Sequence, residues 1–224
     1  MIQLSARWKE LQPEASVGFL ALRHLENPPT HPALEAAADQ AAEQLRQRWG
    51  DLDRPGLREQ PGLAAYDDFY RQFRKTYHVQ LQLESVVFQH QPIRASSALV
   101  TAMFLVELET GLLTAVHDRD RLKEPLLADV SRGGEKFTQL SGQDQELKAG
   151  DLYISDQQGN ISSVIYGPDR RTRIRPETTA AAFTTYGPPG ITGGEIRQQL
   201  ERIEACVGIF SPQLEREILL VLPE

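Results

Sequence analysis

The sequence predicts a mixed α/β domain, and three observations lead to that prediction. Short apolar segments bounded by turn residues, such as 15–22, are typical of buried strands. Apolar residues recur at three- and four-residue spacing in 33–49 and 192–207, which indicates amphipathic helices. The chain has 224 residues, of which 40% are hydrophobic, and this is enough for a substantial core. We therefore expect residues 1–224 to form a single domain.

The first half of the chain predicts one strand followed by two helices. Residues 15–22, ASVGFLAL, form the strand, and the alanine-rich residues 33–49 form a helix that Gly50 ends. The buried stripe of this helix comprises Leu34, Ala38, Ala41, Leu45 and Trp49. A Pro- and Gly-rich connector at 56–62 precedes a second helix over 66–77. One face of that helix carries Phe69, Phe73 and Tyr77.

From residue 85 onwards the pattern favours strands, with one exception. The apolar run 98–108 is rich in Ala, Met and Leu, which favours a helix over a long strand. Strands are expected at 152–155, 162–166 and 180–186, because Gly, Asn, Asp and Pro turns separate these segments.

Residues 192–224 predict a helical tail. Thr192 followed by Glu195 three residues later is the pattern of a capping box. The expected buried stripe consists of Ile196, Leu200, Ile203 and Val207. Ser211-Pro212 repeats the start signal and predicts a final short helix. Cys206 is the single cysteine, which excludes an internal disulfide, and its place beside the stripe indicates a core residue.

Charge and composition limit the classes of function. The 31 acidic residues exceed the 24 basic ones by 7, which argues against coating nucleic acid or an anionic membrane through the whole surface, although one local basic face stays possible. Neither DNA nor a membrane is an expected partner. No apolar run approaches the ~20 residues of a membrane span, and the start lacks the layout of a signal peptide. We therefore expect a cytoplasmic protein. The histidines are scattered without ligand spacing, so neither a metal nor another cofactor is expected.

Two basic clusters stand out against the acidic composition. The first consists of Arg71, Arg74 and Lys75 on the second predicted helix. The second consists of Arg170, Arg171, Arg173 and Arg175. Alternating spacing would place Arg171, Arg173 and Arg175 on one face of a strand, where they can follow a phosphate backbone. The alternative is a charged outer face paired with nearby Asp and Glu.

Several segments in a fixed order carry a resemblance to a known family. After Tyr70-Arg71 come GLLTAVHD (111–118), SRGGEKFTQLSG (131–142), AGDLYISDQQGN (149–160) and RPETTAAAF (175–183). This order resembles the B3/B4 domain, the editing module of the bacterial phenylalanyl-tRNA synthetase β subunit, which also occurs as small free-standing proteins. The match covers about 15–187. It implies a three-layer α/β fold containing an unusual β-sandwich. The residue pattern additionally predicts helices at both ends of the chain.

The resemblance also implies a function. In the synthetase, this domain hydrolyses wrongly attached tyrosine from its tRNA. A free-standing copy resembles a trans-editing factor, which hydrolyses the ester of a mischarged aminoacyl-tRNA and holds the tRNA transiently at a basic edge. Two alternatives remain open. One is a non-catalytic module that binds tRNA or a free amino acid, and the other is an interaction protein that docks a partner through its basic clusters and terminal helices.

The same resemblance implies where the site lies. The family's editing-site histidine aligns with Ala115, and the nearby imidazole is His117, on the same face of an extended segment. The family's glutamate falls near Pro168 or Asp169, which makes Asp169 its acidic counterpart. Ester hydrolysis needs a group that polarises the attacking water. We therefore take His117, Glu135 and Asp169 as the catalytic candidates.

Each candidate also has a structural interpretation. His117 would be an exposed turn residue, Glu135 a solvated charge, and Asp169 a cap on a turn. The expected substrate contacts are Asp118, Asp156 and Thr179, although Asp156 also precedes a hairpin turn. The expected tRNA contacts are Arg71, Arg74, Lys75, Arg171, Arg173 and Arg175.

Overall fold

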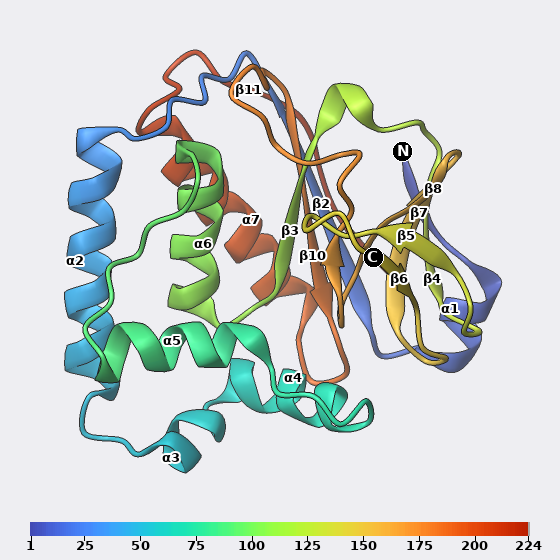
Figure 1. Ribbon diagram of the computed structural model, residues 1–224, viewed down its shortest axis with the longest axis horizontal. Helices are drawn as coiled ribbons and strands as arrows, with labels where there is room; N and C mark the ends of the chain where they lie inside the picture. The colour runs from blue at the N-terminus through green and yellow to red at the C-terminus, as the bar shows by residue number, and fades with distance from the viewer. Residues whose placement is uncertain (224) are drawn as a thin grey trace.

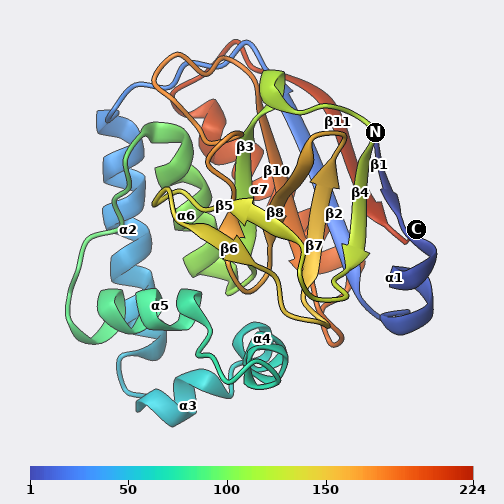
Figure 2. The same cartoon turned by 45° about the vertical axis from the view of Figure 1, so that its right-hand side comes forward.

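The computed structural model describes residues 1–223 and has three layers (Figure 1). Helices form the first layer, a four-stranded sheet forms the second, and a five-stranded sheet forms the third. The view in Figure 2 shows the five-stranded sheet in front of the four-stranded one. Two sheets with helices on one outer face make the α/β fold that the sequence resemblance implies.

The middle sheet has the strand order β11-β2-β10-β3, and all of its pairs are antiparallel. Its strands are β11 (Glu215–Leu222), β2 (Ser16–Arg23), β10 (Ala181–Gly187) and β3 (Thr114–Asp118). All residues of β10 and all of β2 except Arg23 are buried, because helices cover one face and the second sheet covers the other. This explains why 15–22 is a continuous apolar run.

The outer sheet has the order β1-β4-β7-β8-β9. Its strands are β1 (Ile2–Leu4), β4 (Leu126–Val130), β7 (Leu152–Asp156), β8 (Gly159–Ser163) and β9 (Gly167–Pro168). Only the β1–β4 pair is parallel. A separate hairpin consists of β5 (Lys136–Thr138) and β6 (Asp144–Glu146). A 3-10 turn, η1 (Arg119–Arg121), follows β3.

The helical layer rests on the middle sheet through α6 (Ala98–Thr110) and α7 (Gly193–Gly208). Gly18 of β2 allows the close approach of α7, because a Cβ atom there would collide with Ile196 and Leu200. Outside these helices lie α2 (Pro32–Trp49) and α5 (His78–Phe88). The short helices are α1 (Ala6–Leu11), α3 (Arg54–Arg58) and α4 (Pro61–Arg71). One main hydrophobic cluster extends from Ile2 to Val221.

The structure confirms several elements expected from the sequence. The strand at 15–22 and the helix at 33–49 correspond to β2 and α2. The apolar run 98–108 is helical, as its Ala, Met and Leu content predicts. Thr192 and Glu195 form the capping box of α7, whose predicted stripe is fully buried.

Other elements were predicted wrongly. The helix expected at 66–77 is α4, which begins at Pro61 and ends at Arg71, and α5 then occupies 78–88 where strands were expected to begin. Residues 78–88 bury Val79, Leu83, Val86 and Val87 at helical spacing, so tertiary burial outweighs the β preference of valine. The connector 56–62 contains part of α3 and the start of α4.

The final short helix predicted at Ser211-Pro212 is a turn followed by strand β11. The Ser211 hydroxyl does not cap a helix, because it accepts a bond from the Glu26 amide at 2.8 Å and donates to the Glu26 carbonyl at 3.1 Å. Residues 215–222 then pair along β2. The C-terminal tail is therefore one helix and one strand, so it is helical only up to Gly208.

Candidate active site

A cavity of about 530 Å³ opens between α5, α6 and the start of β3. The rest of its lining comes from β9, from the segment that connects β9 with β10, and from residues 94–96, Leu140, Ser163 and Tyr186. Most of its surface is apolar, from Val100, Met103, Phe104, Leu113, Val116, Leu140 and Ile174. An apolar cavity of this size with a few convergent polar groups is typical of a small-molecule site.

Glu107 is the carboxylate in the cavity wall, and its side chain is almost fully buried. Its Oε1 accepts a hydrogen bond from the Thr114 amide at 2.6 Å. Burial raises the pKa of Glu107 to about 8, because the apolar surroundings disfavour the charged form and the Thr114 bond offsets this only in part. Glu107 is therefore mostly protonated at neutral pH.

Buried amide and hydroxyl groups hold Thr114, and through it the start of β3, against the helices. Gln199 of α7 donates from Nε2 to Thr114 Oγ1 at 2.5 Å and to the Leu112 carbonyl at 2.9 Å. The hydroxyls of Thr114 and Thr185 are 2.8 Å apart. These contacts fix the amide that bonds Glu107, so the carboxyl group has a defined position.

His78 begins α5 and lines the same cavity. The Tyr70 hydroxyl donates to the Val164 carbonyl at 2.5 Å, so it accepts at 3.0 Å from His78 Nδ1. This assignment places the ring proton on Nδ1 and leaves the Nε2 lone pair free. Burial lowers the pKa of His78 to about 4, so the ring is neutral at neutral pH.

Two arginines also line the cavity. Arg94 forms an ion pair with Asp39, with 2.8 Å between Nη2 and Oδ1. Arg173 donates only to the Arg170 carbonyl at 2.9 Å and has no carboxylate partner among residues 1–223. Arg173 is the one predicted tRNA contact that the structure places in this wall.

The predicted catalytic residues His117 and Asp169 lie behind the cavity wall and do not line it. His117 is fully buried, so it is not an exposed turn residue. Thr172 connects the two: its hydroxyl donates to Asp169 and accepts from His117 Nδ1 at 2.8 Å. Burial and, to a smaller extent, the positive charge of Arg171 lower the pKa of His117 to about 3. We refer to His117, Thr172 and Asp169 as the threonine-linked cluster.

The position of this cluster explains what it does. Ala115 lines the cavity, and His117 lies two residues further along β3, where Thr172 covers it. Pro168 and Arg173 line the cavity on either side of the cluster's Asp169 and Thr172. The cluster therefore positions a wall segment of the cavity.

The predicted substrate contacts Asp156 and Asp118 have structural partners. Arg171 binds Asp156 with both terminal nitrogens, at 2.8 and 3.0 Å. Asp118 accepts from the Thr178 hydroxyl at 2.9 Å and from the Asp120 amide at 3.2 Å. Neither carboxylate lines the apolar cavity.

Glu135 lies in a different region from the other two catalytic candidates. It accepts from the Ser131 hydroxyl and from the Arg132 amide, and so closes the turn that contains two glycines. Partial burial tends to raise the pKa of Glu135, but these hydrogen bonds outweigh it and lower the pKa. The structure does not bring Glu135 together with His117 and Asp169.

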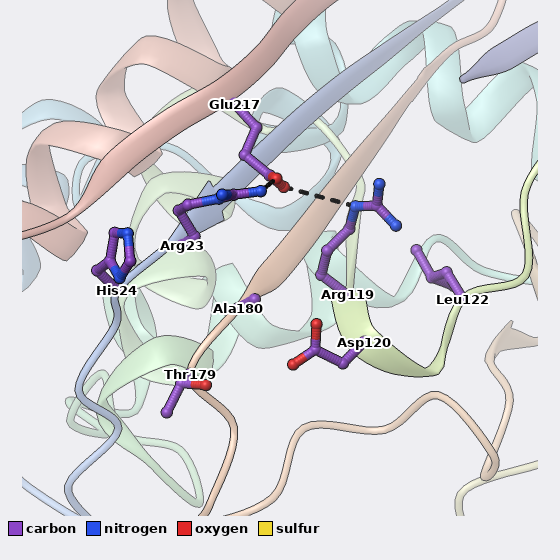
Figure 3. A pocket seen from close by; sticks show the side chains of 8 residues that line it. All are labelled: Arg23, His24, Arg119, Asp120, Leu122, Thr179, Ala180 and Glu217. Atoms are coloured by element: carbon purple, nitrogen blue, oxygen red, sulfur yellow. Dashed lines mark ion pairs between the residues drawn. The ribbon is translucent and has the colours of Figure 1, made fainter.

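Thr179 lines a separate surface hollow, shown in Figure 3. Glu217 lies between Arg23 and Arg119 there and pairs with both, at 3.7 Å from Arg119 Nε. Arg119 is paired with Glu124 as well, at 2.6 Å. The arginines of this hollow are therefore already neutralised, and its lining is mainly polar.

The strand face predicted for Arg171, Arg173 and Arg175 does not exist. Residues 170–180 are turns and irregular chain, because Asp169 bonds the Thr172 amide and Pro176 interrupts the segment. Arg171 and Arg175 pair with acidic residues, and Arg71 pairs with Asp67 at 2.6 Å. Arg74 and Lys75 are exposed. Binding of tRNA by these residues stays a prediction.

Sequence reasoning missed Glu107 and His78. Glu107 had a usable signal, since it is the only charged residue in the longest apolar run, 98–108. A lone acid in a buried apolar run needs a hydrogen-bond partner, a cation or a cavity, and each of these can mark a site. His78 had none, because its role depends on Tyr70 and on a wall contributed by distant segments.

Within residues 1–223, no group of three or more His, Cys, Asp or Glu side chains is arranged to hold a metal ion. No helix in the same range is long and apolar enough to cross a bilayer.

The fold and the site define a class of protein: a three-layer α/β domain with an apolar cavity beside its middle sheet. The model of the B3/4 domain family matches residues 69–202, more than half of the chain, and the protein therefore belongs to this family. A similar solved structure is that of an N-terminal fragment of the phenylalanyl-tRNA synthetase β-subunit from Pyrococcus horikoshii. The two structures superpose with a TM-score of 0.51 at 10% sequence identity. The superposed region covers 100% of this chain and 54% of the fragment. This likeness concerns the fold, and the chain spans about half of that fragment. No curated protein matches in sequence.

Proposed function

We propose that the protein hydrolyses the ester bond of aminoacyl-tRNA, with the aminoacyl group bound in the apolar cavity. One observation carries the proposal: Glu107 and His78, both with strongly shifted pKa values, line one apolar cavity. Membership of the B3/4 family and the fold shared with a synthetase fragment support a tRNA-linked substrate. We place the catalytic groups in the cavity and give the threonine-linked cluster a positioning role.

The aminoacyl ester carries a charge that is complementary to an ionised carboxylate in the cavity wall. The single positive charge of an ester with an uncharged side chain is its α-ammonium group, and among residues 1–223 Glu107 is the only carboxylate that lines the cavity. An arriving ammonium group favours the ionised form of Glu107, because an opposite charge at short range lowers the pKa of a carboxyl group. The apolar walls then accept an uncharged aliphatic or aromatic side chain. Glu107 thus anchors the substrate.

His78 acts on the attacking water. Its Nε2 lone pair is free, because Nδ1–H is held by Tyr70. The neutral ring accepts a hydrogen bond from water and directs the water oxygen at the ester carbonyl. The water oxygen bonds to the carbonyl carbon while His78 Nε2 takes up a water proton. As the C–O bond to the ribose breaks, this proton passes to the ribose oxygen, and a free amino acid and uncharged tRNA result. The hydroxyl of Ser96 and the amide of Gln82, also in the lining, are available as donors to the carbonyl oxygen.

The test is a panel of mischarged aminoacyl-tRNAs incubated with the protein. At least one with an uncharged side chain is expected to be deacylated faster than in buffer. N-acetylation of that substrate removes the ammonium charge and is expected to lower kcat/KM about 100-fold, since a hydrogen-bonded charge pair is worth ~2–3 kcal/mol. The penalty is expected to vanish in Glu107→Gln. Deacylation of no substrate on the panel would refute the function.

A second candidate function is binding of a free amino acid without turnover. Arg173 favours it, because a cation without a carboxylate partner in the cavity wall suits an α-carboxylate. Calorimetric titration with free amino acids distinguishes the two, since micromolar binding without deacylation supports this alternative.

A further inference from the structure

A second hollow, of about 450 Å³, lies where the end of α4 meets the turn between β6 and β7. It is lined by Gln72, Phe73, Arg74, Lys148, Ala149 and Gly150, and we call it the basic notch. Arg74 and Lys148 are both exposed, and neither forms an ion pair among residues 1–223. Arg71, one turn earlier, differs because Asp67 and Asp68 pair with it.

The backbone at Arg74 is unusual. The Lys75 amide donates to the Tyr70 carbonyl and the Arg74 amide to the Arg71 carbonyl, which together form a Schellman motif at the end of α4. Its left-handed residue is normally glycine, yet here it is Arg74, with φ 57°. The chain accepts this conformational cost at a position where the side chain enters the notch lining.

Lys75 and Tyr166 relate the basic notch to the apolar cavity, because each is a near neighbour in sequence of residues that line them. Lys75 Nζ lies 4.6 Å from the centre of the Tyr166 ring. His78 follows Lys75 after two intervening residues, and Gly167 directly follows Tyr166. Both His78 and Gly167 line the cavity. Along the chain, Lys75 therefore places a cation between Arg74 of the notch and His78 of the cavity.

We propose that the basic notch binds the phosphate backbone of the RNA strand whose aminoacyl end enters the cavity. This inference rests on the proposed function. Arg74 and Lys148 contact phosphates, and Lys75 on Tyr166 lies between them and the cavity. The negative end of the α4 dipole gives Arg74 and Lys75 a second, purely structural role, but Lys148 lies on another segment and has no such role. A strand that enters the cavity from this side crosses Tyr166 first.

The test measures binding of uncharged tRNA by fluorescence anisotropy over a series of salt concentrations. The double variant Arg74→Ala with Lys148→Ala is compared with a matched control, Lys123→Ala with Arg197→Ala. The control removes the same charge from two exposed cations elsewhere on the molecule. The first pair is expected to weaken binding about tenfold and to reduce the slope of log K against log salt by about 1.4, or ~0.7 for each lost phosphate contact. The control is expected to change both by little.

Equal losses in the two double variants, or no loss in the first, would overturn the proposal. Displacement of tRNA by inorganic phosphate is compared with that by chloride at equal ionic strength. A specific effect of phosphate that the first double variant abolishes would mean a site for isolated phosphate, which also overturns it. Hydrolysis of a short aminoacyl ester, aminoacyl-adenosine, is expected to be unchanged in this variant. Because uncharged tRNA has no ester, this binding test and the hydrolysis test fail independently.

Discussion

The apolar cavity and the threonine-linked cluster both bury ionisable side chains, but their polar atoms have different partners. In the cluster, Thr172 connects His117 with Asp169, and Arg171 lies 3.6 Å from Asp169. In the cavity, one oxygen of Glu107 bonds the Thr114 amide while the side chain lines open space. His117 Nε2 is also buried without a hydrogen-bond partner in the described part of the chain, so the cluster is not saturated, but His117 does not line the cavity. Glu107 does line it, and a polar group in a cavity wall is available to a ligand there.

The largest expected effect concerns the free energy of unfolding of the protein at high pH, which depends on Glu107 in the cavity wall. In the unfolded protein Glu107 loses its proton near pH 4.5, whereas in the folded protein it keeps the proton until about pH 8. The folded state therefore binds more protons in this window, and stability falls as the pH rises through it. Glu107→Gln removes this loss. We expect the free energy of unfolding of the Glu107→Gln variant, relative to that of the parent protein, to increase by on the order of 4 kcal/mol between pH 5 and pH 9. Urea unfolding at each pH measures this difference.

Glu135→Gln is the control for that experiment. The pKa of Glu135 is lowered in the folded state, so its charge adds stability above the unfolded pKa. Replacement by glutamine is expected to destabilise the protein towards high pH, the opposite direction. Parallel pH profiles of the two variants would contradict the assignment of Glu107.

The next effect concerns the threonine-linked cluster. Thr172→Val keeps the shape of the side chain but leaves His117 Nδ1 and one Asp169 oxygen with fewer partners in a buried site. The free energy of unfolding is expected to fall by about 3 kcal/mol. Thr138→Val is the matched control, because it removes an exposed bond to Asp144 and is expected to cost less than about 0.5 kcal/mol. Similar losses in both variants would mean that the cluster is not structural.

The smallest effect concerns His78. His78→Gln replaces the ring that carries the free Nε2 lone pair, which acts on the water in the transition state more than on the bound substrate. The kcat for deacylation is expected to fall about tenfold with KM nearly unchanged. Single-turnover and steady-state kinetics measure the two separately. A rise in KM alone would mean that His78 binds the substrate and has no role in the chemical step.

The sequence predicted those elements correctly whose hydrogen bonds form between residues close together in the chain. The capping box at Thr192 and Glu195 is local, and the structure contains it. The interpretation of Ser211 failed because its hydroxyl bonds Glu26, far away in sequence. The resemblance to the B3/B4 domain led to the correct fold and to Ala115 in the cavity wall. It did not reveal Glu107, whose pKa depends on burial by elements distant in sequence.

The comparison of Glu107→Gln with Asp169→Asn tests most directly whether the cavity or the cluster carries the chemistry. Both changes replace a buried carboxyl by an amide, and both variants are assayed as folded protein, with deacylation of the best substrate followed in single turnovers. Glu107→Gln is expected to lower kcat/KM about 100-fold, while Asp169→Asn is expected to retain most activity per folded molecule. An inactive Asp169→Asn beside a fully active Glu107→Gln would place the chemistry in the threonine-linked cluster and contradict this account.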